Sequence, residues 1–180
     1  IGSLGRFSKA KDQKNYITAV AGISRSKENV RFLMVGKELT NNNIELTKWA
    51  KELDIQDKLI LYGECSDVSM CLSSMDIYCL HSRREGFPNA LCEAMLVGLP
   101  CVSTDVGDVE VVLKNVGIIV PKEDSVALKH GLEKLLALTP DERYKIGQEA
   151  RKRISNNFSL AKARERYEEV YKKILMDYKN

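Results

Sequence analysis

The stretch Ser-Arg-Arg-Glu-Gly-Phe-Pro-Asn-Ala-Leu-Cys-Glu-Ala-Met, residues 82–95, decides how the rest of this chain is interpreted. It follows an apolar run, residues 77–80, and leads into a helix-like run that ends at Gly98. This order predicts a strand, a polar turn and a helix. In an open parallel sheet, ligands bind beyond the carboxyl ends of the strands, at turns of this kind. We therefore expect the chemistry of the protein at this turn.

The helix that follows the turn is predicted to span residues 88–97, with Pro88 at its first position. A helix start leaves backbone N–H groups unpaired, here those of Asn89 and Ala90, and such a start attracts anions. Glu93 is the one ionisable carboxylate of this run. Because a buried carboxylate without a partner is heavily penalised, this face is either open to water or meets a polar ligand. The pattern alone leaves both alternatives open.

Compact apolar runs, most of which end in glycine or a polar residue, alternate with helical patterns along the first two thirds of the chain. The predicted strands are residues 1–5, 30–36, 58–63, 77–80, 99–104 and 117–121, and the predicted helices between them are residues 15–24, 44–53, 68–73 and 88–97. Hairpin signals such as Asn-Gly are absent from the sequence. The alternation predicts an α/β fold with a doubly wound, Rossmann-like parallel sheet.

The remainder of the chain is predicted to be helical. Asp124 or Ser125 caps a helix over residues 126–138, and Thr139-Pro140-Asp141-Glu142 has the pattern of a capping box. Ser159 starts a last helix with a broad apolar stripe, which includes Tyr167, Tyr171 and Tyr178. This stripe covers either the sheet of its own domain or a second domain outside this chain. We accordingly divide the chain into a domain over residues 1–158 and a final helix over residues 159–180.

Composition excludes several functional classes. The 180 residues fit one domain, by the rule of about 150 residues per domain. A net charge of +3, without basic blocks interleaved with aromatic residues, gives no support for nucleic-acid binding. The chain has no apolar run of about 18 residues and no signal peptide. It begins at Ile1, inside a predicted strand, so we expect it to be a piece of a longer polypeptide.

Neither the cysteines nor the histidines indicate a metal site. The five cysteines are odd in number and have no C-x-x-C spacing, which is typical of small core residues in a reducing compartment. His81 and His130 are far apart and unaccompanied. We expect no metal. His81, at a strand end, is interpreted as a structural surface residue, with a place in the site as the alternative.

The loop after the first strand carries four cations in nine residues, 6–14. The glycines at positions 2 and 5 do not form G-x-G-x-x-G, which argues against a dinucleotide-binding dehydrogenase. The cations are either a solvated loop, as most such charges are, or part of a site shared with the turn at residues 82–95.

An ordered set of short motifs resembles the carboxy-terminal domain of the retaining family 4 glycosyltransferases, of the kind found in bacterial cell-surface polysaccharide synthesis. The motifs are Gly5-Arg6-Phe7 with Lys11-Asp12, residues 32–36, Leu61-Tyr62-Gly63, residues 85–95, Gly98-Leu99-Pro100, residues 104–107 and Gly117. They cover nearly the whole chain in the right order. The resemblance implies one half of a two-domain GT-B glycosyltransferase.

The resemblance also implies the roles of individual residues. The family's paired glutamates match Glu85, which would face the donor sugar, and Glu93, which would hold the ribose of the nucleotide. The family's basic pair matches Arg6 and Lys11, which would bind the diphosphate. The turn and helix start, Gly86, Phe87, Pro88, Asn89 and Ala90, would complete the nucleotide-sugar site. Relatives often have proline in place of His81 and glycine in place of Asp108, so these two positions depart from the family pattern.

The implied reaction transfers a glycosyl group from a nucleoside diphosphate sugar, with retention, to a saccharide or lipid-linked acceptor. We expect no cofactor and no metal, since no Asp-x-Asp sequence is present. The expected partners are the donor, the acceptor and a missing amino-terminal domain; the expected location is the cytoplasm, with peripheral association at the inner face of the membrane left open. The alternatives are an inactive nucleotide-sugar-binding module and a sugar-nucleotide epimerase of the same architecture.

Overall fold

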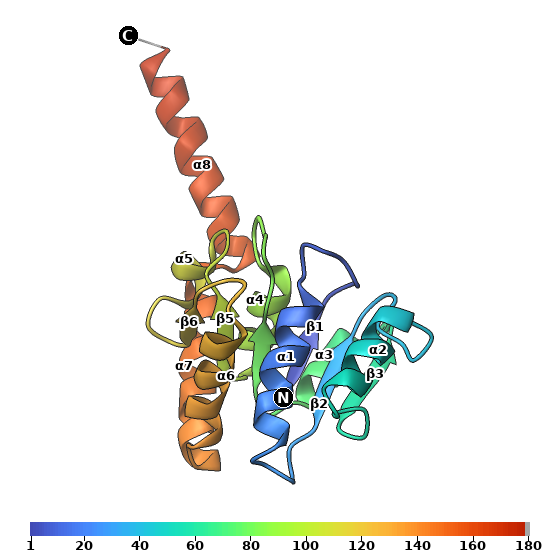
Figure 1. The fold of residues 1–180 in the computed structure, drawn as a ribbon. Helices are drawn as coiled ribbons and strands as arrows, with labels where there is room; N and C mark the ends of the chain where they lie inside the picture. Colours follow the sequence, from blue (N-terminus) through green and yellow to red (C-terminus); the bar gives the residue numbers. More distant parts are fainter. Residues whose placement is uncertain (179–180) are drawn as a thin grey trace.

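The structure is a computed structural model that describes residues 1–178, with the backbone alone for residue 177. It contains one six-stranded sheet with helices on both faces (Figure 1). The strands are β1 (Gly2–Leu4), β2 (Phe32–Val35), β3 (Leu59–Gly63), β4 (Tyr78–Leu80), β5 (Cys101–Thr104) and β6 (Ile118–Val120). The helices are α1 (Gln13–Ser24), α2 (Ile44–Glu52), α3 (Val68–Ser73), α4 (Asn89–Val97), α5 (Val109–Leu113), α6 (Ser125–Leu136), α7 (Pro140–Asn157) and α8 (Leu160–Asp177).

The sheet has the strand order β3-β2-β1-β4-β5-β6, and all neighbouring strands are parallel. Helices α1, α2 and α6 pack on one face, and α3, α4 and α7 pack on the other (Figure 1). The order of the strands reverses between β1 and β4, which are neighbours. This topology confirms the predicted doubly wound fold and places the switch point, where such sheets bind ligands, above β1 and β4.

Two hydrophobic cores fill the space on the two faces of the sheet. Successive side chains of a strand point to opposite faces, so Cys79 of β4 joins the core beneath α1 and α6, while Tyr78 and Leu80 join the core beneath α4 and α7. All three side chains are buried. Strands covered on both faces must be nearly continuously apolar, which is why the sequence identifies them so clearly.

Two glycines allow the loops above the sheet to approach one another closely. A Cβ on Gly36, after β2, would collide with the carbonyl oxygen of Gly5, after β1. A Cβ on Gly107 would collide with the carbonyl of Gly86 and lie 2.5 Å from that of Glu85, and Gly107 also has a φ of +51°. No other residue type satisfies both demands at position 107, so this glycine holds the loop after β5 against the turn at residues 82–88.

Most predicted helices are present, with differences at their ends. The capping box of α7 is confirmed: Thr139 and Glu142 cap each other as predicted. Asp124 caps α6 and Ser159 caps α8. The prediction that Pro88 occupies the first helical position is wrong, because α4 begins at Asn89 and Pro88 is its N-cap residue. Helix α1 begins two residues earlier than predicted, and α2 and α6 end one and two residues earlier.

Helix α5 was not predicted. It spans five residues, Val109–Leu113, and buries Val109, Val112 and Leu113 in the core beneath α4 and α7. A helix of little more than one turn leaves too few residues for a 3.6-residue period to be recognised.

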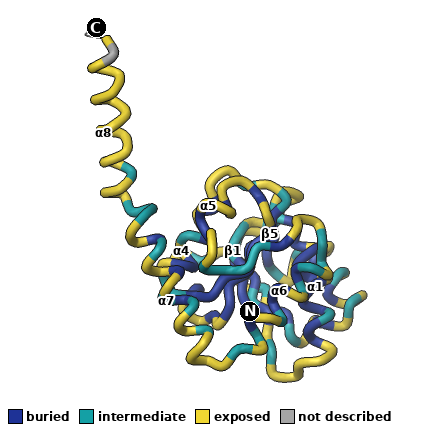
Figure 2. Tube along the Cα trace, turned by 90° about the vertical axis from the view of Figure 1, so that its left-hand side faces the viewer, coloured by how far each residue is buried: buried dark blue, intermediate teal, exposed yellow. Residues whose placement is uncertain are grey.

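Helix α8 extends away from the rest of the structure (Figures 1 and 2). Its apolar stripe is exposed, including Tyr167 (66 %), Tyr171 (63 %) and Tyr178 (89 %). The stripe therefore does not cover the sheet of its own domain, and that alternative is wrong. The division at residues 158 and 159 and the packing of α8 on another domain stay predictions. No helix within residues 1–178 is both long and apolar enough to cross a membrane.

Candidate functional site

The loops that follow β1 and β4 lie together above the switch point of the sheet. The backbone N–H groups of Arg83 and Arg84 both donate to the carbonyl oxygen of Ala10, at 2.8 and 3.3 Å. These bonds join the basic loop after β1 to the turn at residues 82–88, although the two segments are more than 70 residues apart in sequence. The sequence suggested that the two loops share a site, and the structure confirms that they meet.

Lys11 and Glu85 form an ion pair at the centre of this contact. Lys11 Nζ lies 2.5 Å from Glu85 Oε1, and Ser82 Oγ donates to the same oxygen at 2.6 Å. The two side chains retain 23 % and 12 % of their exposure. Behind them, the buried Thr104 Oγ1 donates to the carbonyl oxygen of Ser82 at 2.7 Å. The Glu85 carboxylate is thus held in one position by Lys11 and Ser82, and the Lys11 ammonium group neutralises its charge.

His81 contacts the backbone of Lys11. Its ring is buried and stacks on Tyr16, with ring centroids 4.8 Å apart, and its Nδ1 lies 2.5 Å from the carbonyl oxygen of Lys11. Burial lowers the pKa of His81 to about 4, so the ring is neutral at pH 7. Since a carbonyl oxygen can only accept, Nδ1 carries the proton. The interpretation of His81 as a surface residue is therefore wrong, because the ring is buried and fixes the backbone of Lys11.

Arg83 links three loops through its two carboxylate partners. Its Nη2 donates to Asp12 Oδ1 at 3.2 Å, and Nε lies 2.8 Å from Oδ2, within ion-pair distance but without hydrogen-bond alignment. Its Nη1 lies 3.2 Å from Glu123 in the loop before α6. Asp12 is buried and has left-handed backbone angles, φ 52° and ψ 52°. The hydrogen bond with Asp12 raises the pKa of Arg83 further, so this guanidinium is a permanent charge.

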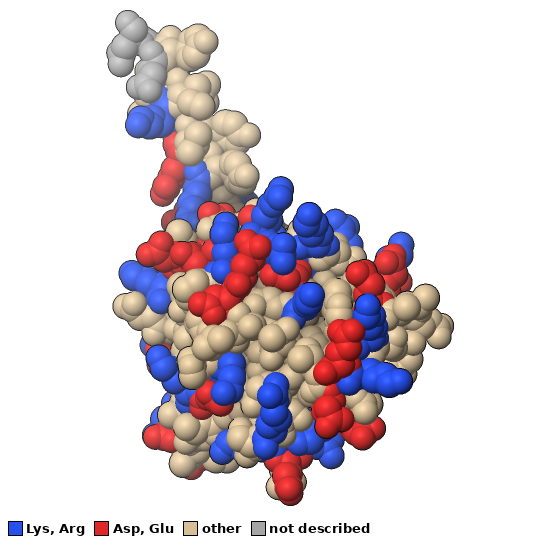
Figure 3. Space-filling view, in the orientation of Figure 1, with Lys and Arg blue, Asp and Glu red and all other residues tan. Residues whose placement is uncertain are grey.

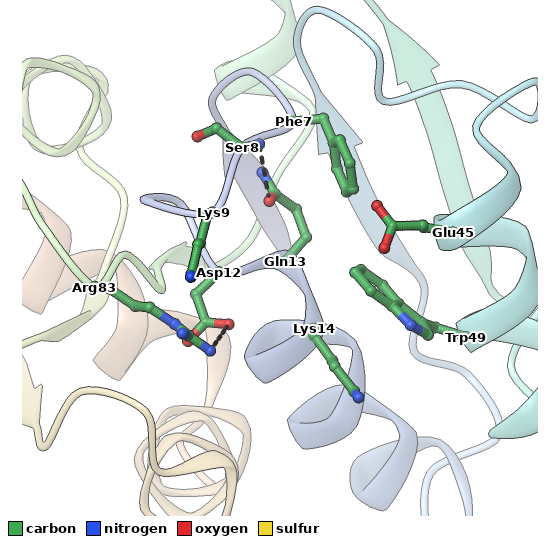
Figure 4. A pocket seen from close by; sticks show the side chains of 9 residues that line it. All are labelled: Phe7, Ser8, Lys9, Asp12, Gln13, Lys14, Glu45, Trp49 and Arg83. Carbon is green, nitrogen blue, oxygen red and sulfur yellow. Dashed lines mark hydrogen bonds and ion pairs between the residues drawn. The ribbon is translucent and has the colours of Figure 1, made fainter.

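Figure 4 shows a further cavity, which the Arg83–Asp12 ion pair lines on one side. Its volume is about 320 Å³, and Phe7 and Trp49 form one wall, with ring centroids 6.1 Å apart. Gln13 anchors the loop on this side, since its Oε1 accepts from the N–H of Ser8 at 3.3 Å and its Nε2 donates to the carbonyl oxygen of Arg6 at 2.9 Å. The basic loop is thus held by its own helix as well as by the turn after β4.

The amino end of α4 has one open donor. The N–H of Asn89 has no partner inside the helix, as predicted, but it donates to the carbonyl oxygen of Phe87 at 3.0 Å and is therefore not free. The N–H of Ala90 has no acceptor within residues 1–178, as predicted. No side chain caps this helix, and its first turn contains no acid. An uncapped helix start of this kind is favourable for an anion.

Glu93 stands one turn further along α4. Its side chain is exposed and has no ion pair or hydrogen bond within the described part of the chain. Although the residue as a whole is exposed, partial desolvation of its carboxyl group raises the pKa of Glu93. Of the two alternatives left by the sequence, the structure shows this face of α4 open to water. Hydroxyl groups of a ligand could still donate hydrogen bonds to the Glu93 carboxylate.

All nine predicted site residues line two adjoining hollows. The first, of about 260 Å³, is lined by Lys11, Glu85, Phe87, Pro88, Asn89, Ala90 and Glu93, together with Leu4, Gly5 and Leu80. The second, of about 690 Å³, is lined by Arg6, Lys11, Glu85 and Gly86, together with Ser8, Ala10 and Arg84. Lys11 and Glu85 belong to both. Within residues 1–178, no group of three or more His, Cys, Asp and Glu side chains converges to hold a metal ion, and a metal-independent reaction stays a prediction.

The arrangement combines fixed positive charge, an open helix start and a carboxylate in one place. Arg6 is exposed and has no carboxylate partner within residues 1–178, and Lys11 has further donors beyond the one directed at Glu85. These groups can bind a phosphorylated ligand and stabilise negative charge that develops on it. The fold and the site together define an α/β domain with groups suited to an anion at the switch point of a parallel sheet.

The family of this domain follows from its sequence. Residues 1–153 match the family described as glycosyl transferases group 1, and the chain belongs to this family. The chain is 31 % identical to the capsular polysaccharide biosynthesis glycosyltransferase CapM of Staphylococcus aureus, over 98 % of this chain and 47 % of the relative. It thus spans about half the length of the curated relatives it matches.

Solved structures confirm the fold. HepE from Anabaena, solved in complex with UDP, superposes with a TM-score of 0.84 at 20 % identity, over 96 % of this chain and 48 % of that one. The carboxy-terminal domain of a glycosyl transferase group 1 protein from Francisella tularensis superposes with a TM-score of 0.77 at 21 % identity, over 88 % of this chain and 85 % of that one. These neighbours support the GT-B-type Rossmann-like domain that the sequence predicts.

Proposed function

We propose that this chain is the donor-binding domain of a glycosyltransferase that uses a nucleoside diphosphate sugar. The observation that carries the proposal is the convergence of Arg6, Lys11 and the open N–H of Ala90 around the two hollows that share Glu85. A diphosphate presents several anionic oxygens, which can accept hydrogen bonds from a mixed set of ammonium, guanidinium and backbone donors. HepE, with the same fold, was solved with UDP bound, which makes UDP the first nucleotide to test.

The proposed mechanism places one chemical role on each group. When the bond between the sugar and the diphosphate breaks, negative charge grows on the leaving phosphate and positive charge on the sugar ring. Arg6, Lys11 and the Ala90 N–H stabilise the phosphate charge, and Lys11 and the Ala90 N–H, which are held in place before the reaction, need little reorganisation. Glu85, held by Lys11 and Ser82, faces the sugar and stabilises its positive charge. Glu93 accepts hydrogen bonds from the ribose hydroxyl groups.

The same proposal extends to the outcome of the reaction and the rest of the protein. Transfer occurs with retention of anomeric configuration, to a saccharide or lipid-linked acceptor, and without a metal ion or cofactor. The acceptor site and a second catalytic wall lie in an amino-terminal domain outside this chain, against which the apolar stripe of α8 packs. We place the full-length protein in the cytoplasm, at the inner face of the membrane when its acceptor is lipid-linked. Membership of a transferase family argues against the epimerase alternative.

Calorimetry and thermal-shift measurements with UDP, GDP and ADP test the proposal directly. A nucleotide that binds only the folded state raises the melting temperature by mass action. We expect Arg6→Ala and Glu93→Ala to weaken the binding by about tenfold or more, since each removes a charged partner of the ligand. Arg31→Ala, an exposed arginine before β2, is the matched control and should bind normally. Absence of binding at millimolar nucleotide would contradict the proposal.

Product analysis with the full-length protein tests the remaining parts. Transfer to an acceptor by the full-length protein, but not by this chain alone, is the expected result. Nuclear magnetic resonance of the product reports whether the anomeric configuration is retained. Normal activity after removal of divalent metal by a chelator would support metal independence, and loss of activity would contradict it. An inactive binding module would bind nucleotide but transfer nothing in the full-length protein.

A further inference from the structure

A third hollow adjoins the donor site on the side away from α4. It has a volume of about 550 Å³ and is lined by Lys9, Ala10, Arg83, Arg84, Lys122 and Glu123. It shares Ala10 and Arg84 with the hollow that contains Arg6, Lys11 and Glu85. The space-filling view shows several Lys and Arg side chains at the upper edge of the domain, to the right of the base of α8 and interspersed with Asp and Glu (Figure 3). None of the proposed donor contacts uses this third hollow.

The charges around this hollow are unbalanced. Arg83 is paired with Asp12 and Glu123. Lys9, Arg84 and Lys122 are all exposed, and within residues 1–178 none of them has a carboxylate within ion-pair distance. Glu85 is occupied by Lys11 and Ser82, and Asp124 by the backbone of α6. Three unpaired cations that surround one concavity repel one another, and an anion in the hollow would relieve this repulsion.

The loops that carry these cations are fixed relative to one another. The carbonyl oxygen of Ala10 joins the backbone of Arg83 and Arg84 to the loop of Lys9, and the Arg83 guanidinium joins this loop to the one that carries Lys122. Arg83 therefore has a structural role, since it connects the loops that carry the three unpaired cations. A fixed frame distinguishes this set from cations scattered on separate, independent loops.

We infer that this hollow binds a phosphate or diphosphate group carried by the acceptor, the rest of which binds to the amino-terminal domain. A diphosphate concentrates several negative charges in a small volume, and the Arg84 guanidinium can bind two of its oxygens at once. A membrane surface would favour cations spread over a flat face, whereas these cations converge on a concavity. The shared residues Ala10 and Arg84 place the anion next to the hollow of Glu85, where the reaction takes place. The inference rests on the proposed function for its identification of the acceptor.

The test measures inorganic diphosphate binding to the 180-residue chain by calorimetry, with phosphorus magnetic resonance as a second readout. Wild type is expected to bind two diphosphates, one in the donor site and one in the third hollow. The variant Lys9→Gln/Arg84→Gln/Lys122→Gln is expected to bind one diphosphate. The variant Lys9→Gln/Lys122→Gln, which keeps Arg84 in the lining of the donor hollow, is expected to weaken binding of the second diphosphate and to keep its affinity for the donor nucleotide. The variant Arg6→Ala/Lys11→Ala is expected to keep the diphosphate of the third hollow. These variants therefore separate failure of this inference from failure of the proposed function.

Matched controls define the results that would overturn the inference. Lys27→Gln/Lys51→Gln/Lys145→Gln removes the same number of charges from exposed positions elsewhere and should bind two diphosphates. A single diphosphate in wild type that is lost in Arg6→Ala/Lys11→Ala would overturn the inference. So would tighter binding of a glucuronate disaccharide than of diphosphate in the third hollow. Binding to phosphatidylglycerol vesicles that depends on the three cations, without a second diphosphate, would assign the hollow to the membrane instead.

Discussion

Helices α4 and α7 pack against each other on one face of the sheet, but their amino ends are held by different means. At α7, Thr139 and Glu142 cap each other, and Asp141 adds a second acid to the first turn. At α4, Pro88 offers no side-chain cap, the first turn contains no acid, and the N–H of Ala90 is open. Helix α7 is completed by its own sequence, whereas α4 is held from outside, by the loops after β1 and β5.

The two helix starts therefore differ in role: the start of α7 contributes to stability, and the start of α4 is available for a ligand. A capped helix start has less capacity for an anionic ligand, because its own side chains occupy some of the donors and supply negative charge. An uncapped start retains that capacity and must be positioned by its neighbours. Gly107 and His81 are the residues that position it here: Gly107 packs on the carbonyls of Glu85 and Gly86, and His81 fixes Lys11.

The largest effect is expected for Gly107→Ala. The new Cβ collides with the carbonyls of Glu85 and Gly86, and the backbone angle at this position is unfavourable for alanine. We expect a loss of roughly 3 kcal/mol in the free energy of unfolding, measured with urea, together with weaker nucleotide binding. Gly86→Ala is the control, because a Cβ there meets no atom within 4 Å. Equal stability of the two variants would contradict the view that α4 is positioned from outside.

A pH dependence is expected from His81. In the unfolded chain its pKa is near 6.5, and in the folded chain burial lowers it to about 4. Between these values the unfolded state binds more protons, so stability is present above pH 6.5 and is lost as the pH falls toward 4. The total loss is roughly 3 kcal/mol.

Urea unfolding at several pH values measures this dependence. His81→Phe keeps an aromatic ring against Tyr16 but has no titrating group, so its stability should change less between pH 6.5 and pH 4. It also leaves the Lys11 carbonyl without its donor, and nucleotide affinity should fall at pH 7. His130→Phe, on the exposed side of α6, should retain the wild-type slope. Identical slopes for wild type and His81→Phe would rule out this account.

A matched pair of charge changes compares the two helix starts. Asn89→Asp places an acid in the first turn of α4 and should weaken nucleotide binding by about tenfold while raising the free energy of unfolding by about 0.5 kcal/mol. Asp141→Asn removes an acid from the first turn of α7 and should lower the free energy of unfolding by a similar amount without affecting the nucleotide. Calorimetry and urea unfolding of both variants check the pair. Unchanged nucleotide affinity in Asn89→Asp would show that the α4 start does not contact the ligand.

Thr139→Ala is expected to change stability alone. It removes the side-chain half of the capping box and should lower the free energy of unfolding by about 1 kcal/mol, the usual value for a lost N-cap. Nucleotide affinity should stay at the wild-type value, because the cap is remote from Lys11 and Glu85. A clear loss of affinity would mean that the α7 start is coupled to the site, and the separation of the two helices would fail.

The fold was largely predictable because its signals are local. Each strand is a short apolar run, since both faces of the sheet are covered, and the caps of α6, α7 and α8 are written in adjacent residues. Helix α5 was missed because five residues carry no period. The one-residue error at Pro88 arose because proline is acceptable both at the N-cap and at the first helical position.

The site was predictable as a set of residues but not as a set of contacts. All nine predicted residues line the two adjoining hollows. The ion pairs Lys11–Glu85 and Arg83–Asp12 each join residues more than 70 positions apart, and no sequence pattern specifies which cation of one loop meets which acid of another. Opposite charges at the ends of adjacent strands were the available signal for Arg83. The burial of His81 had no local signal, because it depends on Tyr16 and on the position of the Lys11 backbone.

The junction between α7 and α8 lies next to the turn at residues 82–88. Phe158 is the C-cap residue of α7, and its ring centroid lies 6.0 Å from that of Phe87. The Arg153 guanidinium lies 5.7 Å from the centroid of the Phe158 ring. Helix α8 has 18 residues and is about 27 Å long, so a rotation of about 10° at Phe158 moves its far end by about 5 Å. Phe87 belongs to the turn that lines the hollow of Glu93, so any repacking of the Phe158 ring against it would displace the far end of α8 by several times the movement at the ring.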